Sequence, residues 1–295
     1  MKKIVSTVVA VCALMLAGCV NNDPFGTAND PDTITIGSQD YYSNEIIAEI
    51  YAQALEKRGH KVKRELRIGQ REAYLPEIES GSIDLFPEYT GPLLQYWKKD
   101  TSARLPEDVY AELTKATPNG LRVLKQSPAT DQDAYTVTKE FSDKWGVKNI
   151  SDLKKVTDSL TLGANSEAES RPYGPAGLEK AYGVKAAFSP IEDGGGPLTV
   201  RALKDNDIQL AIIYTADPSV ASNNLVSLAD PNGLFLASNV VPLASNDVDS
   251  GAEEVINKVS ATLTPVDLIE LNARSVNEKL PAERIASDWL KEKEL

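Results

Sequence analysis

The chain has 295 residues, of which 42% are hydrophobic and 25% charged, and its formal net charge is −12. These values are typical of a globular protein of about two domains, and they exclude a disordered chain, a collagen and a multi-span membrane protein. The acidic balance disfavours nucleic acid as a partner, because phosphates need Lys and Arg. One histidine and two cysteines are too few for a catalytic triad, a zinc cluster or a disulfide framework. We therefore expect no catalytic residues, no metal and no cofactor.

The N-terminal segment is predicted to direct export. Two lysines precede an apolar stretch at 4–15, which is too short to span a bilayer. A Leu-Ala-Gly-Cys motif follows and ends at Cys19, which is typical of a lipoprotein signal; a plain secretory signal is the alternative. We expect cleavage of residues 1–18, acylation of Cys19 with palmitate among the chains, and an anchor on the extracytoplasmic side of the membrane. Residues 19–31, rich in Asn, Asp, Pro and Gly, are predicted to form a flexible tether.

After the tether, strand and helix patterns alternate. Apolar spacing predicts helices at 44–57 and 73–79, between strands at 33–37, 61–66 and 83–86. Such a β-α-β-α-β order predicts a parallel sheet with helices on both faces.

A helix at 109–115 and strands at 121–124 and 135–138 are predicted next. A second α/β unit then follows, with helices expected at 151–156 (with Ser151 as N-cap), 177–182 and 198–204, and strands at 159–163, 208–214, 225–228 and 235–241. After Ser250 the chain is predicted to be helical in two segments, broken near Pro265 and Pro281.

This order of elements predicts a two-lobed α/β fold with a C-terminal helical return. We expect residues 32–130 and 240–295 in the first lobe and residues 135–235 in the second. The chain would then cross between the lobes near 131–134 and again near 238–239. Two short crossovers form a hinge on which lobes can close around a ligand.

Four segments resemble one known family. They are IGSQD at 36–40, EIYAQAL at 49–55, GSIDLFPEYTG at 81–91 and YTAD at 214–217. With them the chain resembles, over residues 32–293, the substrate-binding proteins of ABC transporters for glycine betaine, choline and carnitine. The resemblance implies a two-lobed periplasmic-binding-protein-like fold and a monomeric receptor rather than an enzyme. Its partners would be a small organic cation or zwitterion and an ABC permease with its ATPase.

In this family, tyrosine rings hold a quaternary ammonium group between the lobes. Such a group donates no strong hydrogen bond and is best held by aromatic faces. By resemblance, Gln39 is a polar ligand contact, and Tyr89 and Tyr214 are cage tyrosines. Asp133 stands where a further tyrosine is expected, and the family pattern is also broken at Val200, at Pro92 and at Ser238-Asn239. We therefore expect a cage thinned to about half.

Five further residues are candidates for the ligand site. Asp131 and Asp133 could attract a cation by charge, although solvated turn acids are the alternative. Arg171 could hold a ligand carboxylate in bidentate fashion, with a surface salt bridge as the alternative. Of the adjacent Tyr41 and Tyr42, one is expected to line the cleft, and we select Tyr42 as the candidate. Asp217 is a further candidate, with a capping or hinge role as the alternative.

Other motifs carry less. The Gly-Gly-Gly-Pro stretch at 194–197 precedes a predicted helix but lacks the Lys-Ser/Thr of a phosphate-binding loop. His60 lies in a polar turn and is expected to be solvent-exposed. Two other functions remain open at this point: an envelope enzyme that uses Asp131 and Asp133, and a sensor or adhesin lipoprotein on the same fold.

Overall fold

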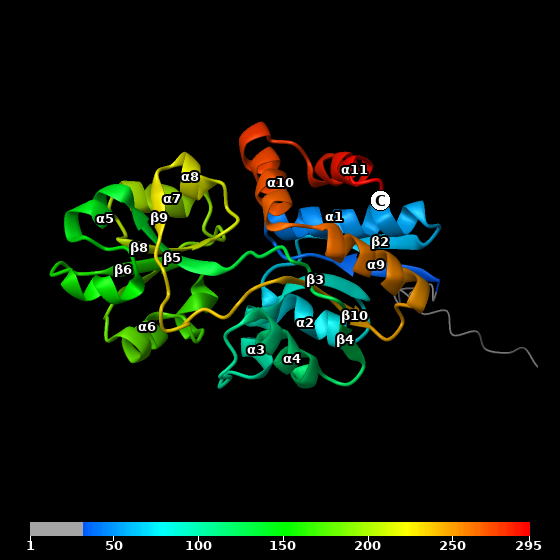
Figure 1. Ribbon diagram of the computed structural model, residues 1–295, viewed down its shortest axis with the longest axis horizontal. Helices are drawn as coiled ribbons and strands as arrows, with labels where there is room; N and C mark the ends of the chain where they lie inside the picture. Colours follow the sequence, from blue (N-terminus) through cyan, green and yellow to red (C-terminus); the bar gives the residue numbers. More distant parts are fainter. Residues whose placement is uncertain (1–31) are drawn as a thin grey trace, which may run out of the picture. The chain divides into compact units, whose positions relative to one another are not determined.

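The computed structural model describes residues 32–295, which build two five-stranded sheets with helices (Figure 1). The predicted signal segment 1–18, the lipid attachment at Cys19 and the tether 19–31 lie outside the described residues. Within the described part of the chain, no helix has the length and apolarity needed to cross a membrane.

The first sheet has the strand order β2-β1-β3-β10-β4. Its strands are β1 (Thr33–Gly37), β2 (Lys61–Glu65), β3 (Leu85–Tyr89), β4 (Leu121–Val123) and β10 (Val240–Ser245). β1 runs parallel to β2 and β3, whereas β10 runs antiparallel to β3 and β4. The first three strands are parallel, as predicted from their β-α-β-α-β order, and the sheet as a whole is mixed because β10 returns from far along the chain.

Alternating side chains of the first sheet contribute to two hydrophobic cores, one on each face. Leu85 and Val240 pack on one face, whereas Phe86 and Val241 pack on the other, as the period of two in a strand requires. The first face carries α1 (Tyr42–Lys57), α9 (Ser250–Thr262), α10 (Pro265–Glu278) and α11 (Ala282–Glu292), and the second carries α2 (Arg71–Glu79), α3 (Thr90–Trp97) and α4 (Pro106–Ala116) (Figure 1). The C-terminal helical return thus covers α1, in three helices where two were predicted.

The second sheet has the order β7-β6-β8-β5-β9. Its strands are β5 (Asp133–Thr138), β6 (Thr161–Ala164), β7 (Ala187–Pro190), β8 (Leu210–Tyr214) and β9 (Leu225–Ser227). Its helices are α5 (Lys139–Trp145), α6 (Pro175–Tyr182), α7 (Pro197–Lys204), α8 (Ser219–Ser222) and two 3-10 helices at Ile150–Lys155 and Ser166–Ser170. The segment predicted as a helix with Ser151 as its cap is the first of these 3-10 helices, and Asn149 caps it.

Two further local predictions were wrong. The strand predicted at 235–241 begins only at Val240, and His60 is half-buried instead of exposed. The segment after Tyr89, for which no helix was predicted, forms α3. A Cβ at Gly91 would lie 2.7 Å from the carbonyl oxygen of Ala237, so this helix needs glycine to pack against the segment before β10.

The two segments that connect the sheets run side by side. Thr130 and Asn239 form an isolated antiparallel bridge, and the Asp131 backbone N–H donates to the Ser238 carbonyl at 3.1 Å. The Ser238 hydroxyl donates back to the Asp131 carbonyl at 2.7 Å. The chain therefore passes from one sheet to the other and back through a paired connection.

Candidate functional site

A cavity of about 40 Å³ lies next to this paired connection, with walls from both sheets. Its lining is rich in tyrosine and in charged groups: Gln39, Tyr41, Gln70, Arg71, Tyr89, Pro92, Asp131, Asp133, Glu167, Arg171, Tyr173 and Tyr214. Six of the eight predicted ligand residues are in this set, and the structure places Tyr42 and Asp217 elsewhere.

Strand ends bring the predicted residues together. Gln39 follows β1, Tyr89 ends β3 and Tyr214 ends β8, so each lies at the carboxyl end of its strand. Asp133 begins β5 and lies opposite Tyr214 in the antiparallel ladder. Ligands commonly bind at this edge of α/β sheets, where loops leave the strands.

Four tyrosines line the cavity: Tyr41, Tyr89, Tyr173 and Tyr214. The rings of Tyr41 and Tyr214 lie 4.7 Å apart and are tilted by 44°. Tyr173 was not predicted, and of the adjacent pair Tyr41-Tyr42 it is Tyr41, not the selected Tyr42, that lines this cavity. Tyr41 has an extended backbone (φ −145°, ψ 126°) just before α1, and its ring lies 4.7 Å from that of Tyr42, the first helical residue. The two adjacent rings are thus in contact, but only the ring of Tyr41 lines this cavity.

Tyr42 and Asp217 instead line a neighbouring cavity of about 680 Å³. The Tyr42 hydroxyl donates to Asp217 Oδ2 at 2.7 Å. Asp217 Oδ1 accepts from the backbone N–H of Ser219 at 2.7 Å, which is the capping role considered as its alternative. Together the two residues link α1 to the segment after β8.

Asp131 is buried in the paired connection, with only 3% of its surface exposed, so it is not a solvated turn residue. Its Oδ1 accepts from the Ala216 backbone N–H at 2.9 Å, and its Oδ2 accepts from the Tyr41 hydroxyl at 3.3 Å. Burial raises the pKa of Asp131 to about 8; the Ala216 N–H opposes this, and Asp217 and Asp133 add to it.

Asp133 is 8% exposed and is also not a solvated turn residue. Among the described residues, no side chain donates a hydrogen bond to its carboxyl group. Burial raises its pKa to about 6, against the opposing charges of Arg71 and Arg171. Glu167, from the 3-10 helix at Ser166–Ser170, adds a third carboxyl group to the wall, and burial raises its pKa too. Nothing in the sequence singled out Glu167.

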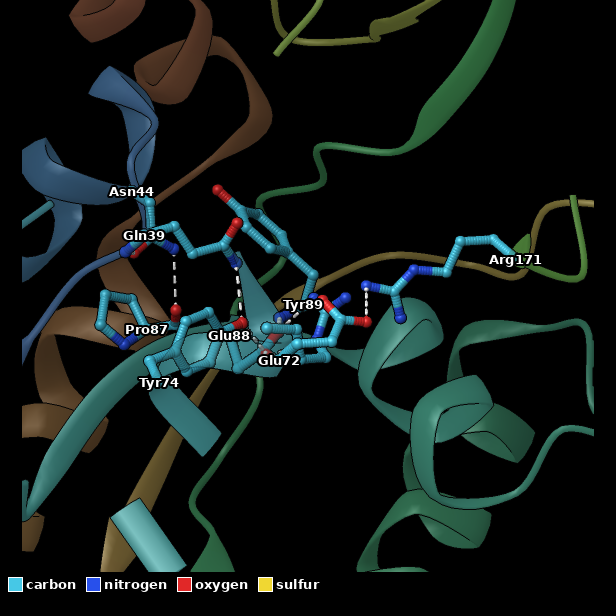
Figure 2. A network of polar contacts seen from close by, with 9 residues as sticks. Gln39, Asn44, Glu72, Tyr74, Pro87, Glu88, Tyr89 and Arg171 are labelled. Atoms are coloured by element: carbon cyan, nitrogen blue, oxygen red, sulfur yellow. Dashed lines mark hydrogen bonds and ion pairs between the residues drawn. The ribbon is translucent and has the colours of Figure 1, made fainter. Parts of the chain in front are cut away.

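The two arginines of the cavity wall are paired with other acids. Arg71 binds Glu88 through two hydrogen bonds, Nε to Oε1 at 2.7 Å and Nη2 to Oε2 at 2.9 Å. Arg171 Nη2 lies 2.7 Å from Glu72 Oε1. A dashed line marks this ion pair in Figure 2. Three carboxyl groups in the wall, those of Asp131, Asp133 and Glu167, therefore have no arginine as an ion-pair partner among the described residues.

A polar network supports the opposite wall (Figure 2). Glu88 has no exposed surface, and besides Arg71 it accepts hydrogen bonds from the Tyr74 hydroxyl and, at 2.7 Å, from the Tyr89 backbone N–H. Gln39 Nε2 donates to the Tyr74 hydroxyl at 3.2 Å. Two residues of the cavity wall, Gln39 and Tyr89, are thus held by one buried carboxylate.

A two-sheet α/β fold whose strand ends surround a small cavity is typical of the solute-binding class of proteins. Residues 32–292 match the family described as the substrate binding domain of ABC-type glycine betaine transport system, and the chain belongs to this family. The family consists of solute receptors of ABC transporters and not of enzymes, so the predicted family and the predicted absence of enzymatic function are confirmed.

Similar proteins span nearly the whole chain. The glycine betaine-binding protein YehZ of Escherichia coli (strain K12) is 24% identical over 275 residues, which cover 88% of this chain and 90% of that protein. The carnitine transport binding protein OpuCC of Listeria monocytogenes is 24% identical over 294 residues, covering 97% and 94%.

Solved structures share the fold. A glycine betaine/carnitine/choline ABC transporter structure superposes with a TM-score of 0.72 at 20% identity, covering 88% of this chain and 98% of the other. An ABC-transporter choline binding protein in complex with choline gives 0.65 at 14% identity, covering 89% of each chain. The predicted periplasmic-binding-protein-like fold is therefore confirmed.

Proposed function

We propose that this protein is a lipid-anchored extracytoplasmic receptor that captures a small quaternary amine and delivers it to an ABC permease with its ATPase. The observation that carries the proposal is the cavity itself, whose lining includes four tyrosines and an acid, Asp133, that pairs with no arginine of residues 32–295. Tyrosine faces attract a trimethylammonium group through cation–π interaction, and a buried carboxylate adds charge attraction. The names of the relatives, which refer to glycine betaine and carnitine, point to the same ligand chemistry.

Among quaternary amines, the charges favour a cation over a zwitterion. A zwitterion such as glycine betaine needs a donor for its carboxylate, yet Arg71 and Arg171 already pair with Glu88 and Glu72. A cation such as choline needs no such donor and gains from the carboxyl groups of the wall.

Ligand entry requires the cavity to widen. Its present volume has room for about three water molecules, less than a trimethylammonium group needs. We propose that the two sheets belong to two lobes, 32–130 with 240–295 and 135–235, which part and close about the paired connection. Support comes from the contacts between them: Arg171 reaches Glu72 on α2, and Tyr42 reaches Asp217.

Isothermal titration calorimetry with choline, carnitine, glycine betaine, a sugar and a neutral amino acid tests the ligand class. Tyr89→Ala should weaken binding of the preferred amine about five- to thirtyfold, or about 1–2 kcal/mol, through the lost ring. Tyr110→Ala, on α4 and outside the cavity, is the control. Binding of sugars or neutral amino acids alone, or unchanged affinity in Tyr89→Ala, would contradict the proposal.

The anchor and the transport role need cellular tests. Cys19→Ser should release the protein from the membrane or leave an uncleaved precursor, measured by fractionation and lipid labelling. Normal labelling of that variant would show that Cys19 is not the acylation site. Uptake of radiolabelled choline should require both this receptor and its permease. If the protein is a sensor instead, its deletion should leave uptake unchanged. Size-exclusion chromatography with light scattering tests the expected monomer.

A further inference from the structure

We propose that Tyr74 is a positioning residue that holds the Gln39 carboxamide in one orientation and thereby makes this end of the cavity selective for ligands with a hydrogen-bond donor. The inference rests on the proposed function, because it concerns the same cavity. Tyr74 itself does not line the cavity; it acts through Gln39, which does.

The orientation follows from the direction of a chain of hydrogen bonds. Both oxygens of Glu88 accept hydrogen bonds from Arg71, as expected for a carboxylate that has no proton to give. Tyr74 must therefore use its only hydroxyl proton to donate to Glu88. The Tyr74 oxygen is left as an acceptor, and the group opposite it, 3.2 Å away, has to be a donor. Gln39 meets this condition only with its NH₂ group toward Tyr74.

Reversing the carboxamide would place two acceptor oxygens against each other. Such a contact would remove the hydrogen bond that the Tyr74 oxygen accepts from Gln39 and set two buried oxygens against each other, which is costly away from water. Tyr74 cannot turn to relieve it, because its ring stacks on Phe86 with 3.9 Å between centroids and 18° between planes. Burial also raises the pKa of Tyr74 well above its usual value, with Arg71 opposing and Glu88 adding, so the hydroxyl stays protonated.

The consequence for a ligand concerns the Gln39 oxygen. Figure 2 shows the carboxamide nitrogen turned to Tyr74 and the oxygen turned away from it. Among the described residues, no group donates a hydrogen bond to this oxygen. A ligand that carries a hydroxyl or N–H group can supply that donor, whereas one that ends in a methyl group cannot.

Choline and ethyltrimethylammonium test this selectivity, because they share the trimethylammonium charge and differ in the hydroxyl. We expect the wild-type protein to bind choline about three- to tenfold more tightly, as one net hydrogen bond allows. Tyr74→Phe should bring this ratio close to one. The matched control is Tyr51→Phe, which removes an equally buried hydroxyl whose partner is Ser260, far from the cavity. An unchanged ratio in Tyr74→Phe, or an equal loss in Tyr51→Phe, would overturn the proposal.

A second measurement needs no ligand and separates this inference from the proposed function. In nitrogen-15 NMR spectra, the side-chain amide signals of Gln39, assigned by their absence in Gln39→Glu, should shift and exchange faster with water in Tyr74→Phe but not in Tyr51→Phe. Signals unaffected by Tyr74→Phe would refute the positioning role. If the signals respond as expected while neither amine binds the wild-type protein, the positioning role stands and the proposed ligand class is wrong.

Discussion

At one end of the cavity, Glu88 receives hydrogen bonds from Arg71, Tyr74 and the Tyr89 backbone; at the other end, Asp133 receives none from a side chain of the described residues. Both carboxyl groups are buried, with exposures of 0% and 8%. The charge of Glu88 is balanced by partners within the protein, whereas the charge of Asp133 is available to a bound ligand.

The difference assigns separate tasks to the two ends. A compensated carboxylate can hold neighbouring groups in place, and Glu88 does so for Gln39 through Tyr74 and for Tyr89 through its backbone. An uncompensated carboxyl group such as Asp133 has a raised pKa, because burial disfavours its charged form. When ionised, it attracts any cation that reaches it. Shape and polarity come from the first end, and charge attraction comes from the second.

The largest effect is expected when the compensated end is broken. Glu88→Gln leaves the buried Arg71 guanidinium without a counter-charge, which should lower the free energy of unfolding by about 3–5 kcal/mol in urea titrations. The control is Glu56→Gln, which removes a partly exposed partner of Arg64 and should cost less than about 1 kcal/mol. Equal effects of the two variants would show that the buried pair is no more important than a surface one.

The acidic end should make stability and binding respond to pH in opposite directions. The pKa of Asp133 rises from 3.8 to about 6 and that of Asp131 from 3.8 to about 8. Between its unfolded and its folded pKa, each group binds more protons in the folded protein than in the unfolded chain. The free energy of unfolding should therefore fall as pH rises, from about pH 4 to 6 for Asp133 and from about pH 4 to 8 for Asp131. The Asp133 contribution is at most about 3 kcal/mol, from a shift of about two units.

Choline carries a permanent charge, so its affinity reports the protonation of the protein alone. The affinity for choline should increase over the same pH range, because the cavity wall becomes more negative as Asp133 and Asp131 lose their protons. Urea unfolding and calorimetry at pH 4.5, 6 and 8 measure the two trends, and Asp133→Asn should remove the step near pH 6 from both. Stability and affinity that rise together with pH would contradict this account of the acidic end.

At constant pH 7.5, Asp133→Asn should weaken choline binding about five- to thirtyfold, since it removes charge with almost no change in size. Glycine betaine should lose less, because its carboxylate is repelled by the same group. The control is Asp143→Asn on α5, which changes the net charge equally but lies at an exposed site paired with Lys139. Equal losses in the two variants would show that only net charge matters.

The residues of the cavity wall and the groups behind them differ in how far the sequence could predict them. Gln39, Tyr89 and Tyr214 were predicted from family motifs, and each follows or ends a strand that apolar spacing also indicated. Asp133 stood out because it replaced an expected tyrosine. These residues depend on local patterns, which survive in a single sequence.

The support behind these residues depends on tertiary contacts and was not predictable. Glu88 lies in a recognised motif, but its pairing with Arg71, 17 residues earlier, appears only when α2 packs on β3. Tyr173 and Glu167 come from irregular segments without periodicity. The helix that begins at Thr90 was missed because glycine and proline generally disfavour helices, but Gly91 is needed for close approach to Ala237 and Pro92 lies in the first turn, where proline is tolerated.

The smallest effect is expected at the rim, where Arg171 pairs with Glu72, whose side chain is 52% exposed. An ion pair this exposed is worth at most about 1 kcal/mol, so Glu72→Gln should hardly change stability. It should, however, free Arg171 to meet a ligand carboxylate and so raise the affinity for glycine betaine two- to fivefold, with choline unchanged. Glu112→Gln, which removes an acid paired with Lys98 on the first sheet's helices, is the control in calorimetry. If Glu72→Gln instead lowers the affinity for both ligands equally, the pair holds the two lobes closed. Arg171 is then part of the contact between the lobes and does not bind a ligand carboxylate.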